Sequence, residues 1–185
     1  MDTGEEKLIT NGLLIGALVI FVVKPVLNTL GVSDEDRQKV ADQGATTPAE
    51  NPFSPNFNPF LQYWQNSQPA GLSVADGMAQ IYEGFEAGTL DRNSQAFLIA
   101  SWADTLDSAL SVWNWSVDTN AVFSVFNQMT SQTQCAALAA YVGYVYGKDL
   151  FHWLHYGGSA IPFIPNGLSE SQVAIIIDEV NNLPE

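Results

Sequence analysis

One long apolar run, residues 8–30, constrains this chain more than any other feature. It reads LITNGLLIGALVIFVVKPVLNTL, and its centre, residues 13–23, carries no charged side chain. As a helix rising about 1.5 Å per residue, the run would span roughly 34 Å, enough to cross the hydrocarbon core of a bilayer. Pro25 follows Lys24, so we expect any kink near the end of the helix. The sequence predicts a single transmembrane helix over 8–30, after a short polar tail over 1–7.

Two alternatives remain for this run. Its apolar centre is short, so it could be a buried helix of a soluble protein, and its position would also suit a signal peptide. The signal peptide is disfavoured because the preceding MDTGEEK is acidic and no A-x-A-like cleavage site follows.

In a membrane helix, Gly12 and Gly16 would form a GxxxG pair through which two copies could pack as a homo-oligomer. The alternative is that glycine is simply common in membrane helices. Basic residues are more numerous after the run, which weakly favours a cytoplasmic C-terminal part.

The negative charge of the chain lies almost entirely after the apolar run. The formal net charge is −14, and residues 1–27, with three acids and two lysines, contribute −1 of it. Residues 28–185 therefore carry −13, from seventeen acidic and four basic side chains. Nucleic-acid affinity depends largely on Lys and Arg, so we predict no nucleic-acid partner and no docking on anionic lipid. An acidic part attached to a membrane would instead stand off the surface, or meet a basic partner or divalent ions. The partner that we expect is a protein, such as a capsid or another basic surface.

Residues 31–70 predict a polar stalk and a proline- and aromatic-rich linker. Ser33 can cap a short helix within 31–43, but that helix has too thin an apolar side to join a core. Five prolines between 44 and 70 disfavour helix and sheet interiors, so we expect extended chain there. Five rings could either complete the core of the following domain or anchor a partner as a docking peptide. These partner-binding candidates are Phe53, Phe57, Phe60, Tyr63 and Trp64.

Residues 71–185 predict a compact acidic bundle of five to seven short helices without strands. Apolar residues recur there at spacings of three and four, and the Val and Ile runs follow the same helical period. The fold class that we expect is therefore all-α, with an N-terminal transmembrane helix. The residues expected to begin helices as N-caps, and the glycine expected to end one, are Ser73, Asp91, Asp118, Ser169 and Gly147.

The stretch 102–184 resembles a single annexin-type helical repeat. The string YVGYVYGKDL at 141–150 is the sharpest match, and the helix after GLSESQ takes the place of the fifth helix of the repeat. The chain is thereby similar to single annexin-like domains behind a membrane segment in proteins encoded by flavobacterial phages. It departs from the family where annexins bind calcium, because WNWSVDTN lacks glycine and HYGGSA lacks an acid. Calcium-dependent lipid binding is therefore not implied.

Few residues in the sequence suggest chemistry. His152 and His155 are the only histidines, and with Asp149 they could form a two-histidine, one-carboxylate metal site. The alternative is packing among aromatic neighbours near a helix end, and we predict no metal site, no cofactor and no catalytic residue. Cys135, the only cysteine, lies in an alanine-rich helical pattern that is typical of a buried position.

Two functions follow from these patterns. The first is a single-pass membrane-anchored structural or adaptor protein, which contacts the bilayer through 8–30 and links it to a protein layer such as a capsid. The resemblance implies a location in the virion membrane of a bacterial virus. The alternative is a membrane-tethered peptidoglycan hydrolase or its accessory subunit, which needs a glutamate enclosed in a cleft that raises its pKa. Glu83 and Glu86 are the first candidates for it, whereas Glu170 lies where an acid stabilises a helix start.

Overall fold

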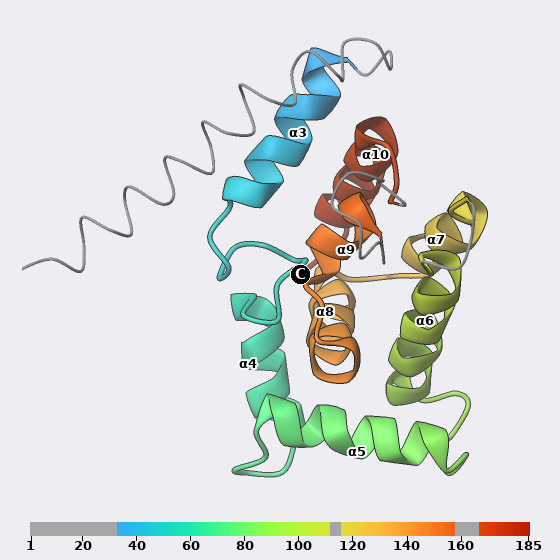
Figure 1. Cartoon of the computed structure of the whole chain (residues 1–185). Helices are drawn as coiled ribbons and strands as arrows, with labels where there is room; N and C mark the ends of the chain where they lie inside the picture. Colours follow the sequence, from blue (N-terminus) through green and yellow to red (C-terminus); the bar gives the residue numbers. More distant parts are fainter. Residues whose placement is uncertain (1–32, 112–115, 158–166) are drawn as a thin grey trace, which may run out of the picture.

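The computed structural model describes residues 33–111, 116–157 and 167–185. All regular structure in these ranges is helical (Figure 1), which confirms the all-α class. The helices are α3 Asp34–Ala45, α4 Asn58–Ser67, α5 Val74–Glu86, α6 Gln95–Ala109, α7 Thr119–Phe126, α8 Gln132–Tyr146, α9 Leu150–Tyr156 and α10 Glu170–Asn181. The transmembrane helix predicted over 8–30 lies outside the described residues. None of the helices within them is both long and apolar enough to span a bilayer.

Side-chain caps fix where most of these helices begin. The Oγ atoms of Ser73 and Ser169 and the carboxylate of Asp118 accept backbone N–H groups as predicted, each satisfying a donor that the helix leaves free. The prediction for α6 was wrong, because its N-cap is Ser94 rather than Asp91. Asp91 instead accepts the backbone N–H of Asn93 at 2.9 Å and so shapes the turn that precedes the helix.

Helix α8 forms the centre of the bundle. It packs against α4, α5, α6, α9 and α10, while α5 runs across the lower end of the molecule in Figure 1. Cys135, Leu138 and Val142 are fully buried on α8, and Ala136 and Ala139 are buried on the same helix. Burial raises the pKa of the Cys135 thiol, which therefore stays protonated. Gly147, at φ 63°, ends the helix in the left-handed conformation that was predicted.

The first half of the predicted linker is not a solvated stalk. Ser33 caps α3 as expected, accepting the N–H of Asp36 at 3.0 Å, but the helix packs along α10. Val40 is buried, and the Nζ of Lys39 lies 2.6 Å from a carboxylate oxygen of Asp178. Apolar periodicity did not reveal this contact because ion pairs supply much of it.

The second half of the predicted linker is also built into the domain. The ring of Phe53 lies 6.2 Å from that of Phe126 and 6.1 Å from that of Phe151, inside the core. Residues 58–67, expected to be extended, form α4. Pro59 is compatible with this helix because it stands in the first turn, where no backbone N–H is needed.

Candidate functional site

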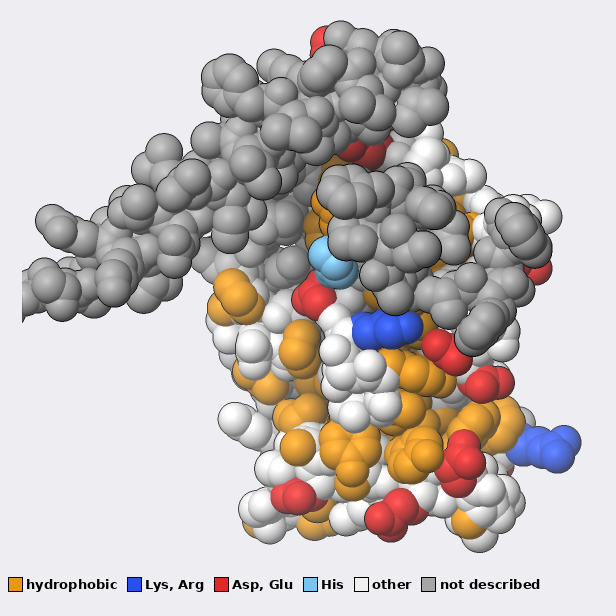
Figure 2. Space-filling model, in the orientation of Figure 1, with side chains coloured by type: hydrophobic (Ala, Val, Ile, Leu, Met, Phe, Trp, Pro, Cys, Tyr) orange, Lys and Arg blue, Asp and Glu red, His pale blue; other side chains and the backbone are white. Residues whose placement is uncertain are grey.

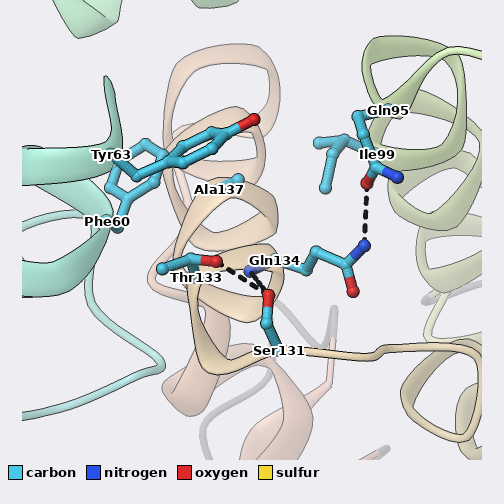
Figure 3. Close-up of a pocket in the computed structure, with 8 residues that line it drawn as sticks. All are labelled: Phe60, Tyr63, Gln95, Ile99, Ser131, Thr133, Gln134 and Ala137. Carbon is cyan, nitrogen blue, oxygen red and sulfur yellow. Dashed lines mark hydrogen bonds between the residues drawn. The ribbon is translucent and has the colours of Figure 1, made fainter. Parts of the chain in front are cut away.

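An open groove lies between α4, α6 and α8 (Figure 3). Its volume is about 240 Å³, and no charged side chain lines it. Gln134 on α8 donates a hydrogen bond to Gln95 on α6 at 2.7 Å, which joins the two walls. A groove of this size suits one or two side chains of a partner better than a whole cofactor. The lining residues are Phe60, Tyr63, Gln95, Ile99, Ser131, Thr133, Gln134 and Ala137.

Only one of the five predicted partner-binding rings is available at the surface. Tyr63 is 55% exposed and lines this groove together with the buried ring of Phe60. The other three, Phe53, Phe57 and Trp64, are buried in the core of their own domain. Of the two alternatives for this segment, core completion therefore holds for four rings, and Tyr63 alone remains a candidate partner contact.

Trp64 shows how closely this segment is fitted to the domain. Its indole Nε1 donates to the carbonyl oxygen of Leu72 at 3.2 Å, so the buried ring keeps its hydrogen bond. The six-membered part of the indole lies against Gly77 on α5, where an added Cβ would come within 2.1 Å of it. Gly77 is thus required for close approach of the ring, and the sequence carries no periodic signal for that contact.

A partly buried polar cluster that was not predicted as a unit joins α3, α9 and α10. Glu170 has one carboxylate oxygen 3.9 Å from Nε of Arg37 and the other 4.0 Å from Nε2 of His155. Burial raises the pKa of Glu170, while the charge of Arg37 acts in the opposite direction. Burial, followed by the charge of His152, lowers the pKa of His155. At neutral pH the His155 imidazole is therefore uncharged, and its contact with Glu170 is not an ion pair.

The candidate metal ligands are used for packing and capping. Asp149 is the N-cap of α9 and accepts the backbone N–H of His152 at 2.8 Å. The ring centroids of His152 and His155 lie 4.5 and 4.3 Å from that of Tyr156. Across 33–111, 116–157 and 167–185, no group of three or more His, Cys, Asp or Glu side chains is arranged to hold a metal ion.

The glutamates first considered for hydrolysis lie at the surface of α5. Glu83 and Glu86 are exposed on α5, and neither lines the groove. Glu170 is the more enclosed carboxyl group, with its side chain 10% exposed. The sequence indicated only its role at the start of α10, because Arg37 and His155 reach it from distant parts of the chain. Gly12 and Gly16 lie outside the described residues.

No protein-family model, no curated protein and no solved structure matches this chain. The resemblance of 102–184 to an annexin-type repeat therefore stays a prediction from its residues. Its sharpest string also has a local physical explanation, because Gly147 ends α8 and Asp149 caps α9 within it.

Proposed function

We propose that this chain is a single-pass membrane-anchored adaptor that holds an acidic helical domain close to a membrane and links that membrane to a protein layer. Residues 8–30 would form the anchor. The observation that carries the proposal is that α3 begins at Asp34, directly after the apolar run, and packs on α10. The folded domain would thus start where the anchor ends.

The reach of such an adaptor follows from how little free chain remains. Fully extended, residues 31–70 would reach on the order of 130 Å at about 3.3 Å per residue. With α3 and the aromatic segment packed into the domain, only residues 31–33 separate the apolar run from folded structure. A short-reach link of this kind suits two layers that lie close together, as a virion membrane and a capsid do.

The charge of the domain directs the link toward protein. Residues 28–185 carry −13, which disfavours anionic lipid and nucleic acid as partners. The uncharged groove beside Tyr63 supplies one place for a partner side chain. The assignment to the virion of a bacterial virus rests on the sequence resemblance alone.

Membrane extraction tests the anchor. The full chain should stay in the membrane pellet through high-salt and alkaline carbonate washes and be released by detergent. Val19→Arg places a charge at the centre of the run and should shift the protein into the washable fraction. Ile175→Arg, at an exposed position on α10, is the matched control and should leave extraction unchanged. Release of the unaltered protein by salt would rule out the anchor.

Site-specific crosslinking tests the protein contact. A photo-crosslinking amino acid at Tyr63 should give one discrete adduct in the native membrane. The same probe at Tyr156, which is 45% exposed on α9 and does not line the groove, is the control. Equal crosslinking from both positions would count against a contact at the groove.

The hydrolase alternative keeps one candidate, Glu170, because partial burial raises its pKa as a catalytic acid requires. Zymography of the full chain in detergent distinguishes the two functions. A lytic band that disappears in Glu170→Gln, with folding intact, would favour the hydrolase, whereas the adaptor predicts no band from either protein.

A further inference from the structure

Helix α3 is the first described element after the apolar run, and its attachment to α10 is mostly polar (Figure 1). Val40 is the one apolar side chain of α3 that is buried. The Nζ of Lys39 lies 2.6 Å from a carboxylate oxygen of Asp178, and Nε of Arg37 lies 3.9 Å from a carboxylate oxygen of Glu170. One buried valine and two charge pairs therefore supply much of the attachment.

The attachment uses half of the basic side chains of the acidic part of the chain. Residues 28–185 contain four basic side chains, Arg37, Lys39, Arg92 and Lys148, and the first two of these lie on α3. On the face that Figure 2 shows, basic side chains are scarce among carboxylates. The attraction between α3 and α10 therefore depends on the two cations of α3, and salt screens it.

Release of α3 from α10 would not leave these two cations unpaired. An Nη atom of Arg37 lies 3.5 Å from the carboxylate of Asp34, and Nζ of Lys39 lies 3.7 Å from that of Glu35. Both acids belong to α3 itself, at the spacings of three and four residues that a helix brings to one side. Each cation is thus shared between α3 and α10, and on release it keeps the partner on its own helix. This lowers the cost of separating the two helices.

The release has a defined end before the aromatic segment. The carbonyl oxygen of Ala49 accepts the backbone N–H of Asn58 at 2.9 Å, and Oδ1 of Asn51 accepts the backbone N–H of Phe53 at 2.9 Å. The ring of Phe53 is 1% exposed in the core. The hydrogen bond from Gln43 to Asn51 crosses this boundary and would be exchanged for water. Chain up to residue 48 can therefore leave with α3, whereas further release requires removal of a buried ring.

We propose that α3 is a releasable strap, which leaves α10 while the rest of the domain stays folded and so lengthens the link between the membrane and the protein layer. This inference rests on the proposed adaptor function and adds a second, longer state to it. With α3 attached, residues 31–33 reach about 10 Å, and with α3 released and extended, residues 31–48 reach roughly 60 Å. Because α3 lies in series between the anchor and the domain, a pull between the two layers acts on it first.

Distances between two spin labels on the full chain, in neutral detergent micelles, test the strap. The labels are attached through Ala41→Cys on α3 and Ala75→Cys on α5, both at exposed positions, whereas the native Cys135 is fully buried. The unaltered protein should give one narrow distance at low salt. The double variant Arg37→Gln, Lys39→Gln should add a broad population and raise the ratio of released to attached molecules about tenfold.

The matched control removes the two cations that lie outside α3, through Arg92→Gln, Lys148→Gln. It changes the net charge by the same amount and should change the ratio by less than about twofold. A second pair of labels, through Ala75→Cys and Ile175→Cys, joins α5 to an exposed position on α10 and should keep one narrow distance in every variant. Equal release by both double variants would mean general repulsion within an acidic chain and would overturn the strap.

Two other results would also overturn it. An unchanged distance between α3 and α5 in Arg37→Gln, Lys39→Gln would mean that packing alone holds α3. Loss of the narrow distance between α5 and α10 in the same variant would mean that α3 leaves only when the domain unfolds.

If the double variant does not fold, salt replaces it on the unaltered protein. Raising the ionic strength from about 0.1 M to about 1 M shortens the Debye length from about 10 Å to about 3 Å and should raise the ratio about threefold. An unchanged ratio would overturn the strap. Because these measurements are made in micelles, their failure leaves the anchor to be decided separately by membrane extraction.

Discussion

Helix α3 and the aromatic segment 53–64 were expected to form one linker, yet they join the domain by different forces. α3 buries one apolar side chain, Val40, and meets α10 through charged and amide groups. The aromatic segment places four rings in the core. The aromatic segment contains Pro55 and Pro59 and α3 contains no proline, yet both join the domain. The number of prolines therefore did not distinguish free linker from packed chain.

The attachments of α3 and of the aromatic segment to the domain should respond differently to salt. Ion pairs at the surface contribute little to stability and are screened by salt, whereas the burial of uncharged rings is not weakened by that screening. α3 should therefore detach locally while the aromatic segment unfolds only with the whole domain. The predictions below test that contrast.

Phe53→Ala should give the largest effect. The ring is fully buried between Phe126 and Phe151, so its removal should lower the free energy of unfolding by about 3–5 kcal/mol. Tyr63→Ala, in the same segment but exposed, should change it by less than about 0.5 kcal/mol. Denaturant unfolding of both variants measures the difference. Similar small losses would show that the segment is a linker after all.

Gly77→Ala should destabilise the protein although alanine favours helix. The added Cβ would lie 2.1 Å from the Trp64 ring, so overpacking should cost about 1–3 kcal/mol. Gly143→Ala on α8 is the matched control, because its nearest neighbour, the carbonyl oxygen of Lys148, lies at an ordinary 3.8 Å. It should stabilise by about 0.5–1 kcal/mol. A stabilising Gly77→Ala, read from thermal melts, would mean that Trp64 does not pack on α5.

The sequence predicted helices well and long-range contacts poorly, for physical reasons. Caps such as Ser169 and the end of α8 at Gly147 are local, because a side chain or one φ angle determines them. The helical period likewise identified the buried sides of α8 and α10. By contrast, the meeting of Glu170 with Arg37, and of α3 with α10, depends on packing between segments far apart in the chain. The residue types in the sequence therefore do not identify the partners in such contacts before the fold is known.

The partly buried cluster of Arg37, His155 and Glu170 should make stability depend on pH. Because the folded-state pKa of His155 is lowered from 6.5, its contribution is complete above that value and is lost as pH falls through 6.5 toward the folded pKa. Glu170 has the opposite sign, since its raised pKa removes stability as pH rises above 4.5. His155→Gln should therefore flatten the acid side of the stability curve below about pH 7. His152→Gln should have a smaller effect, because its charge is only the second cause of the shift.

The smallest effect on global stability, and the most direct test of the contrast, is expected at the Lys39–Asp178 pair. The two side chains meet at 2.6 Å but are partly exposed, so breaking the pair should hardly move the overall melting temperature. Lys39→Glu places two negative charges together and should speed amide hydrogen exchange in α3 alone, leaving α4 protected. Adding Asp178→Lys restores opposite charges and should restore the protection of α3. High salt should imitate the single variant, because screening weakens the same attraction. If exchange in α4 accelerates together with that in α3, the two segments open as one unit, and the distinction between an ionic and an aromatic attachment does not hold.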